Sequence, residues 1–556
     1  MKIESTKKGR KYVGIDPENE INLAYPKTKA DLQIAICFPN SYELGTSNLG
    51  FLSIYRYLNE SDNIRCERFY FDHTRIKKDH ELRSFETNKN LKEFDCLAFS
   101  LSFETDLLNV IRTIQYTGLE VFSEKRDDDS PFIIMGGVVT SINPEPAALF
   151  IDSFIIGDGE QVTVKLLNLY MEHSKKQFDP DFQRKASKLP GLYFPSSIDF
   201  SHDSYGNITR YKVKKGFKNH ISSNVIENID EYKTYSPVIS EKSSFSSCCL
   251  IDVIRGCSRK CNFCVSGNLI FSIRFRSLEN IKGIIENMRK HTNKYGLIAP
   301  SLTDYPDIKG LISLITTYDI EYSLASLRIE SVSKDIIELI KVTKQKTITL
   351  APEAGSDRLR KIINKPLKEE KLLTLIKKLL DNDIFNFKLY FMIGLPTEEK
   401  EDIEGIIETT KKIKHLMLKR AKDALKIGNL IISTSCFVPK PGTPFESQPM
   451  ATQIELKEKL KHLRQSLSRI DNVIFTSDIP KWARIQGMIS KGDRKVGLLL
   501  LKAIEFDGNF PKVFKEVNIN PDYYLHRTYN NEYLSPWSHI KSNCSQCNTN
   551  LTRTNF

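Results

Sequence analysis

The sequence lacks long apolar runs, and this limits where the protein can reside. No stretch approaches the roughly 18 consecutive apolar residues of a membrane-spanning helix. The opening residues, MKIESTKKGRKYVGID, have no apolar core, so we expect no secretory signal. Both absences predict a cytoplasmic protein with no membrane partner. The 11 cysteines agree with a reducing compartment, where clustered thiols usually serve metal binding or catalysis.

A strong charge bias and internal repeats are lacking as well. The 81 Lys and Arg residues exceed the 69 Asp and Glu residues by only 12. Over 556 residues this mild basic bias permits an acidic substrate or a nucleic acid but requires neither. No repeat appears at the periods of solenoid proteins.

Short apolar runs alternate with helix-length amphipathic segments in the first part of the chain. The strand-like runs span 32–38, 94–103, 131–137 and 153–160. Helices are expected near 48–60, 106–118 and 161–172. Buried strands that alternate with helices are typical of an open, mainly parallel α/β sheet.

A second β/α series follows a segment rich in Ser, Asn, Tyr and Lys, 190–247, which we expect to be a linker with some β structure. Its strand candidates span 249–256, 295–300, 322–329, 346–353, 387–394 and 429–439. About six strands with intervening helices, such as 367–382, predict a partial (β/α) barrel. The remainder opens with an amphipathic helix, whose apolar stripe we expect to face the core: Ile454, Leu456, Leu460, Leu463 and Leu467.

Three cysteines, Cys257, Cys261 and Cys264, stand in the segment RGCSRKCNFC directly after the first strand of this second series. Thiolates suit iron–sulfur clusters, most of which use four protein cysteines. A cubane held by three thiolates leaves one iron open, as catalytic zinc sites keep one position open. Nearby side chains add positive charge beside a cluster that is anionic overall: Arg255, Arg259 and Lys260.

Two other interpretations of these cysteines stay open. A zinc site needs a fourth ligand, which Cys248, Cys249 or a remote histidine could supply. A redox C-x-x-C pair of Cys261 and Cys264 is the other. The spacing C-x3-C-x2-C, with Phe263 before the last cysteine, is more specific for the cluster.

The segment RGCSRKCNFC resembles the signature of the radical S-adenosylmethionine (SAM) superfamily, and other segments resemble its branch with an N-terminal cobalamin-binding-like domain. The N-terminal matches are FPNSYELGTSNLG (38–50), FSLSFETD (99–106), GGVVTSINPEP (136–146) and IGDGEQ (156–161). The barrel matches are SLRIES (326–331), TITLAPEAGSDRLRKIINK (347–365), LYFMIGLPTE (389–398) and FVPKPGTPFE (437–446).

The resemblance implies an α/β fold class: an N-terminal Rossmann-like, cobalamin-binding-like open sheet, then a partial (β/α)6 radical SAM barrel and a helical C-terminal region. The divisions are an extension (1–30), the Rossmann-like domain (31–190), a linker with β structure (191–247), the barrel (248–445) and a C-terminal α/β region (446–556). The implied cofactors are a [4Fe–4S] cluster on Cys257, Cys261 and Cys264, as the catalytic ligands, and SAM. The implied partners are a reductant such as flavodoxin or ferredoxin and a substrate that the motifs do not define.

The same resemblance implies where SAM is bound. The second barrel strand ends in APSLTDYP without the common Gly-Gly-Glu, which leaves Ser301, Thr303 and Asp304 as candidates for the SAM amine. Arg328 suits the SAM carboxylate because its guanidinium binds carboxylates bidentately. The backbone of Phe263 is expected near the adenine edge.

Further SAM contacts are implied on the fourth and fifth strands. Glu353 is expected at the ribose, and Gly355 and Ser356 follow it in the segment PEAGS, where the glycine lets the backbone approach. Lys388 and Gly394 lie on and after the fifth strand, the glycine beside the adenine. Structural alternatives exist, because Ser356 suits a helix N-cap and Lys388 could pair with a carboxylate across the barrel.

Cobalamin is a further implied cofactor, but the sequence favours its loss. The motif Asp-x-His-x-x-Gly, which supplies a histidine to cobalt, is absent, and His73 and His80 lie elsewhere. We therefore expect the N-terminal domain to position substrate or to pack against the barrel. Near the C-terminus, Cys544 and Cys547 could form half of a zinc site or second cluster, or a loose tail.

Three functions follow from these patterns. The first is a radical SAM enzyme that generates a 5′-deoxyadenosyl radical. The second is a cobalamin-assisted methyltransferase, or an RNA modifier that resembles methylthiotransferases, although the C-terminal sequence shows no five-stranded RNA-binding barrel and leaves nucleic acid open as a partner. The third is a zinc-stabilised binding protein without enzymatic activity.

Overall fold

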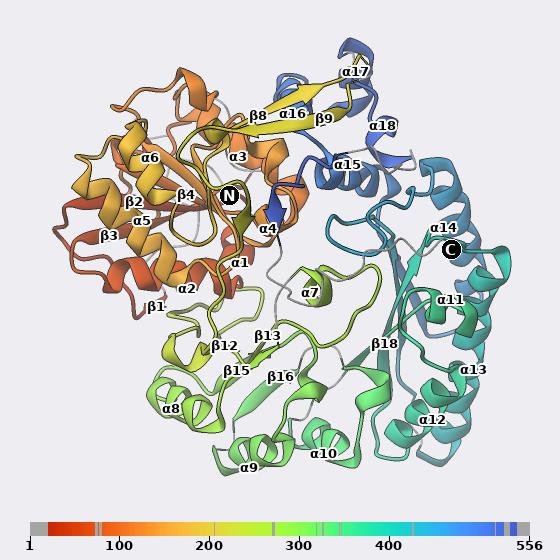
Figure 1. The fold of residues 1–556 in the computed structure, drawn as a ribbon. Coiled ribbons are helices and arrows are strands. Elements are labelled where there is room, and N and C mark those ends of the chain that lie inside the picture. Colours follow the sequence, from red (N-terminus) through yellow and green to blue (C-terminus); the bar gives the residue numbers. More distant parts are fainter. Residues whose placement is uncertain are drawn as a thin grey trace, which may run out of the picture. The chain divides into compact units, whose positions relative to one another are not determined.

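The computed structural model describes residues 20–72, 76, 80–204, 206–269, 273–318, 320–324, 327–343, 345, 347–424, 427–517, 519–526 and 534–541. The chain forms two compact units (Figure 1). The first comprises Met1–Cys249, Ile489–Pro521 and Asn530–Phe556, and the second Leu250–Met488 and Asp522–Tyr529. The C-terminal region contributes to both units, and the five divisions given above stay a prediction. None of the helices described here is long and apolar enough to cross a membrane.

A six-stranded sheet forms the centre of the first unit. In spatial order its strands are β3 (Ile64–Tyr70), β2 (Leu32–Phe38), β4 (Cys96–Ser100), β5 (Phe132–Gly136), β6 (Ser153–Ile155) and β7 (Leu192–Tyr193). All neighbours run parallel except β6 and β7, which are antiparallel. The predicted open, mainly parallel α/β sheet is confirmed.

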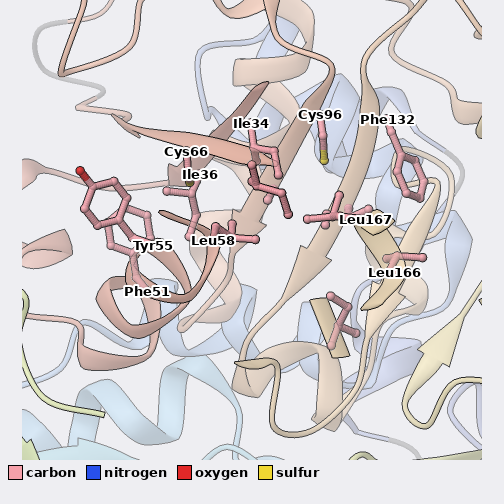
Figure 2. Close-up of a cluster of buried hydrophobic side chains, with 14 of the residues drawn as sticks. Ile34, Ile36, Phe51, Tyr55, Leu58, Cys66, Cys96, Phe132, Leu166 and Leu167 are labelled. Atoms are coloured by element: carbon pink, nitrogen blue, oxygen red, sulfur yellow. The ribbon is translucent and has the colours of Figure 1, made fainter. Parts of the chain in front are cut away.

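Helices connect these strands and bury their apolar side chains against the sheet. They include α2 (Leu49–Glu60), α3 (Leu107–Tyr116), α4 (Val138–Ile142), α5 (Glu160–Glu172) and α6 (Pro180–Ala186). The side chain of Asn48 caps α2 by accepting a hydrogen bond from the Phe51 amide at 2.9 Å. Ile34 of β2 and Leu166 of α5 belong to one buried cluster shared by sheet and helices (Figure 2). The apolar area that this cluster removes from water stabilises the unit.

The predicted linker contains the short β elements expected there. β8 (Ile198–His202) and β9 (Ile208–Val213) form an antiparallel hairpin. β10 (Ile221–Ser222) runs parallel to β21 (Ile540–Lys541), close to the C-terminus. The same unit contains α16 (Arg494–Glu505) and α17 (Phe510–Glu516). Segments far apart in the sequence therefore complete the first unit.

The second unit contains the barrel strands. One sheet has the order β12 (Cys248–Asp252), β15 (Lys294–Ile298) and β16 (Glu321–Leu324). The other has the order β17 (Thr347–Glu353), β18 (Asn386–Ile393), β19 (Leu430–Cys436) and β20 (Val473–Ser477), all parallel. A parallel bridge between Leu327 and Leu350 links the two sheets. The predicted partial barrel is confirmed, and β20 adds a strand that the sequence did not indicate.

The helices of the second unit lie between its strands in the chain. They include α8 (Leu278–Met288), α9 (Ile308–Tyr318), α10 (Lys334–Val342), α12 (Glu369–Leu380), α13 (Lys400–Ala424) and α14 (Gln453–Leu467). Thr452 and Glu455 begin α14 with a reciprocal capping box. The apolar stripe expected on α14 is buried except for Ile454, which is 70% exposed because it lies two residues before Leu456 and so on the opposite face of the helix.

Asp106, just before α3, is a carboxyl group that the fold holds in its neutral form. Burial raises its pKa from 3.8 to about 7, although a hydrogen bond from Asn40 Nδ2 at 3.0 Å opposes the rise. Between these values the folded chain binds a proton that the unfolded chain has lost, so stability falls as pH rises through this window. We expect Asp106→Asn to flatten this fall, measured as the urea midpoint at several pH values between about 4 and about 8. An identical pH profile in the variant would contradict the assignment.

Candidate functional site

The three-cysteine loop runs from β13 (Ile254–Arg255) to the short helix α7 (Val265–Asn268). Asn268 Nδ2 donates to the carbonyl oxygens of Cys261 and Cys264, both at 2.8 Å, and so fixes the turn between them. Gly267 is required here, since a Cβ at this position would lie 1.7 Å from the Arg259 carbonyl oxygen. The loop is a defined backbone structure and not an open connection.

Asn262, which directly follows Cys261, anchors this loop to segments that follow the barrel strands. Its backbone N–H donates to Ile363 O at 3.0 Å, and its side-chain amide donates to Ile362 O at 2.7 Å. Its carbonyl accepts from the Phe445 amide at 3.1 Å. Phe263 packs against a buried cluster of Ala354, Leu359, Ile363, Leu395, Phe437 and Phe445. The loop therefore lies at the carboxyl ends of β17, β18 and β19, where barrel enzymes build their sites.

Two cations lie beside Cys261, which is buried. Burial raises the pKa of the Cys261 thiol, and the charges of Arg328 and Lys365 oppose that rise. The Arg328 guanidinium hydrogen-bonds the Cys261 side chain. Lys365 was not singled out from the sequence, although it stands only 12 residues after Glu353. Burial outweighs the two cations, so the pKa of the free thiol stays above its ordinary value, and Arg328 and Lys365 supply the positive charge beside it.

Glu353 adopts a backbone conformation that is rare for its residue type. It ends β17 with φ of +67°, in the left-handed region, beside a register shift in the pairing of β17 with β18. Its Oε1 accepts a hydrogen bond from Lys365 Nζ at 3.0 Å, and both side chains are mostly buried. Strained residues of this kind cluster at functional sites, and this one is tied through Lys365 to the surroundings of Cys261.

Asp304 lies at the same site. Arg259, within the cysteine loop, donates from Nη2 to Asp304 Oδ1 at 3.0 Å. The other carboxylate oxygen of Asp304 is buried, and the described residues give it no hydrogen-bond partner. The same holds for Nε of Arg328. A buried acceptor and a buried donor without partners indicate a ligand with groups of the opposite kind. Ser301 is buried, its hydroxyl shares a 3.0 Å hydrogen bond with the Thr303 hydroxyl, and its carbonyl oxygen accepts from the Asp304 amide at 3.1 Å.

Comparison with known proteins agrees with this geometry. The family described as Radical SAM proteins, N-terminal, matches residues 50–195, and the Radical SAM superfamily matches residues 251–410. The chain belongs to the radical SAM superfamily. It is therefore an enzyme.

Three similar proteins are distant from this radical SAM enzyme in sequence. An uncharacterized protein of Methanocaldococcus jannaschii is 28% identical over 475 residues, covering 84% of this chain and 90% of that one. A tRNA-2-methylthio-N(6)-dimethylallyladenosine synthase of Pelagibacter ubique is 22% identical, over 56% of this chain and 71% of the synthase. The solved cobalamin-dependent S-adenosylmethionine radical enzyme OxsB gives a TM-score of 0.42 at 15% identity, over 86% of this chain and 56% of that one.

Three residues expected to contact SAM have structural roles in this radical SAM enzyme. A Cβ on Gly355 would lie 1.9 Å from Asp402 O, so the glycine lets the turn after β17 approach α13. Ser356 caps α11 (Asp357–Ile362) by accepting from the Leu359 amide at 3.1 Å, and its hydroxyl donates to Asp402. The amide of Gly394 donates to the Glu398 carboxylate at 2.9 and 3.0 Å. Their roles toward SAM stay predictions.

Gly355 gives a sharp test of this packing. We expect Gly355→Ala to lower the free energy of unfolding by about 1–3 kcal/mol, because the helix and turn must separate. Gly283→Ala in α8 is the matched control, since a Cβ there meets nothing within 4 Å and alanine favours a helix by up to about 1 kcal/mol. Thermal unfolding followed by circular dichroism measures both. Equal midpoints for the two variants would contradict the close approach.

Lys388 does not join the cysteine loop. It stands near the amino end of β18, about 17 Å of extended chain before Ile393 at the carboxyl end. Its ammonium lies 4.8 Å from the centre of the Tyr390 ring. Within the described part of the chain no carboxylate pairs with it, so the ion pair considered from the sequence is not present.

The remaining sequence candidates for metal binding belong to the first unit or lie outside the described residues. No group of three or more His, Cys, Asp and Glu side chains that could hold a metal ion occurs in the part of the chain that is described. The three thiols thus share one loop without converging on one point. His539 is fully buried against Tyr193, with ring centres 4.8 Å apart. Cys544, Cys547 and His73 lie outside the described residues.

Proposed function

We propose that this enzyme holds a [4Fe–4S] cluster on Cys257, Cys261 and Cys264 and cleaves SAM reductively. The observation that carries the proposal is the three-thiol loop at the carboxyl ends of the barrel strands, with Cys261 beside Arg328 and Lys365. Three thiol donors fit a cubane that keeps one iron open. When bound, the cluster supplies the electron that breaks a carbon–sulfur bond of SAM and yields a 5′-deoxyadenosyl radical.

Asp304 and Arg328 are the residues that we assign to the methionyl part of SAM. The unpartnered oxygen of Asp304 is an acceptor that suits an ammonium group. The unpartnered Nε of Arg328 is a donor that suits a carboxylate. These two groups have opposite charges, as the amino and carboxylate groups of SAM do, so they orient the molecule as well as bind it.

Lys365 is the positioning residue for Glu353 in this proposal. It holds the carboxylate of Glu353 at the end of β17, where the ribose hydroxyls of SAM are expected. A carboxylate fixed by an ammonium group keeps its remaining oxygen free to accept from a hydroxyl. The positive φ of Glu353 directs this side chain away from the regular strand pattern.

A second candidate is transfer of a methylthio group, favoured by the likeness to the tRNA-2-methylthio-N(6)-dimethylallyladenosine synthase. That chemistry would use the same loop and the same SAM contacts. The described residues after 446 form helices and two short strands, β20 and β21, which does not favour a five-stranded RNA-binding barrel. We therefore place a 5′-deoxyadenosyl radical acting on an undefined substrate first.

The experiment that tests the proposal is anaerobic reconstitution with iron and sulfide, followed by reduction with dithionite in the presence of SAM. Formation of 5′-deoxyadenosine, measured by liquid chromatography, is the expected result. With RNA added to the same mixture, a methylthioadenosine-containing RNA product would favour the second candidate. Stoichiometric zinc without iron would overturn both.

A further inference from the structure

Open α/β sheets bind ligands beyond the carboxyl ends of their strands, at the point where the strand order reverses. In the first unit that point lies between β2 and β4, because β3 flanks β2 on one side and β4 on the other. A corrinoid in this domain would need free space beyond Phe38 and Ser100. The loops after β2, β4, β5 and β6 surround this position.

The loops on the two sides of the switch point are bonded directly to each other. Asn40 Nδ2, after β2, donates to Asp106 Oδ1, after β4, at 3.0 Å. Asn48 Nδ2 donates to Ser102 Oγ at 2.9 Å. Asn109 Nδ2 of α3 donates to the carbonyl oxygen of the residue after Phe38 at 3.0 Å. Three hydrogen bonds therefore span the place where a ligand would enter.

The glycines after β5 and β6 contact the chain's own backbone. Gly137 has φ of +113°, and a Cβ there would lie 2.3 Å from Leu101 O. Gly157 has φ of +98°, and a Cβ there would lie 2.2 Å from Asn224 O. These glycines allow two segments of the chain to approach each other closely. The space that glycines could leave for a ligand is therefore taken by the chain's own backbone.

The C-terminal part of the first unit packs on the loop after β5. Asn143 Nδ2 donates to Ser490 O at 3.1 Å and to Gly492 O at 2.7 Å, and Asn143 is buried. Arg494 Nε pairs with the fully buried Glu145 at 2.8 Å. Buried polar side chains need hydrogen-bond partners. The C-terminal segment supplies such partners to both Asn143 and Glu145.

Glu145 is the centre of this packing. Tyr193 donates its hydroxyl to Glu145 Oε1 at 2.5 Å, and Arg494 Nη2 donates to the same hydroxyl oxygen at 3.1 Å. A Cβ on Gly497 of α16 would lie 2.6 Å from Pro146 O. Figure 1 shows α16 beside β8 and β9, and the Arg494 guanidinium lies 5.1 Å from the Phe200 ring of β8. The loop after β5, at the carboxyl edge of the sheet, is therefore covered by side chains that hydrogen-bond one another.

We propose that the carboxyl edge of this sheet is an intramolecular docking surface for residues 489–497, and that its residues do not fit a corrinoid. Each loop that would cradle the macrocycle is bonded to another loop or to the C-terminal segment. The N-terminal domain thereby holds the chain's own C-terminal part in place. This inference does not depend on the cluster or on SAM cleavage.

Corrinoid binding tests the second half of the proposal. The purified full chain is mixed with excess hydroxocobalamin, separated by gel filtration and measured by visible absorbance. We expect no corrinoid absorbance with the protein. One corrinoid retained per chain would overturn the proposal, whatever the result of SAM cleavage assays.

Limited proteolysis tests the docking. We expect Asn143→Ala to speed cleavage between residues 489 and 541 about tenfold, because the segment loses two buried hydrogen bonds. Asn228→Ala, at an exposed turn cap of the same unit, is the matched control and should leave the rate unchanged. Arg494→Met tests the same edge should the first variant not fold. Unchanged cleavage in the folded variant would overturn the docking.

Discussion

Replacement of Cys264 by alanine is expected to abolish cluster assembly and SAM cleavage. The loop provides three thiol donors, and a cubane that already leaves one iron open has no spare protein ligand. We expect iron bound after anaerobic reconstitution to fall from about four atoms per chain to near zero. Iron analysis together with visible absorbance measures the change.

Cys436→Ala is the matched control for this variant. Cys436 lies in β19 of the same unit, is also buried, and burial raises its pKa to about 12, so it stays a neutral thiol. Its replacement should leave iron content and 5′-deoxyadenosine formation intact. A Cys264→Ala protein with full iron content and SAM cleavage would show that the ligands have been assigned wrongly.

Arg328→Met is expected to weaken SAM binding strongly. The variant keeps an unbranched apolar stem but removes the guanidinium, whose Nε has no partner among the described residues. A hydrogen bond to a charged group contributes about 1.5–3 kcal/mol, which corresponds to a loss of affinity of roughly tenfold to a hundredfold. Isothermal titration of SAM into the reconstituted protein measures it.

Arg420→Met serves as the control for Arg328→Met, because Arg420 of the same unit makes two long contacts, both at 3.4 Å, to the exposed Asp383 and to Leu380 O. Asp304→Asn should weaken SAM binding through the ammonium group and leave the cluster signal unchanged. Wild-type affinity in both Arg328→Met and Asp304→Asn would remove these residues from the SAM site.

The order of strands and helices could be read from the sequence where strands are apolar. β2 falls on the expected run, and the barrel strands β17, β18 and β19 begin and end within three residues of theirs. β3 was not foreseen, because its charged residues interrupt the apolar pattern. The structure pairs Arg68 of β3 with Glu86 at 2.6 Å inside the unit, so a buried ion pair occupies a position that an apolar residue usually fills.

The candidate site was only partly predictable for a similar reason. Asp304 and Arg328 lie beside the cysteine loop, as the resemblance implied, because both follow the carboxyl ends of barrel strands. Lys365 went unnoticed, because its role depends on the φ of Glu353 and on a contact across a helix, which no local pattern encodes. Lys388 stands near the amino end of β18, which the sequence could not show because the ends of a strand depend on its partners, and its role toward SAM stays a prediction.

The division of the C-terminal region between two units was also beyond local sequence patterns. Asn143 and Glu145 show no sign in the sequence that their partners stand more than 340 residues later. Contacts at such separation are decided by packing of the whole unit and not by helix or strand propensity.

Electron paramagnetic resonance of the anaerobically reconstituted, dithionite-reduced chain, recorded before and after SAM is added, tests the central claim most directly. The account predicts a [4Fe–4S] signal that shifts when SAM is added, because three thiol ligands leave one iron accessible. A chain without a cubane, or a cubane whose signal SAM leaves unchanged, would contradict it.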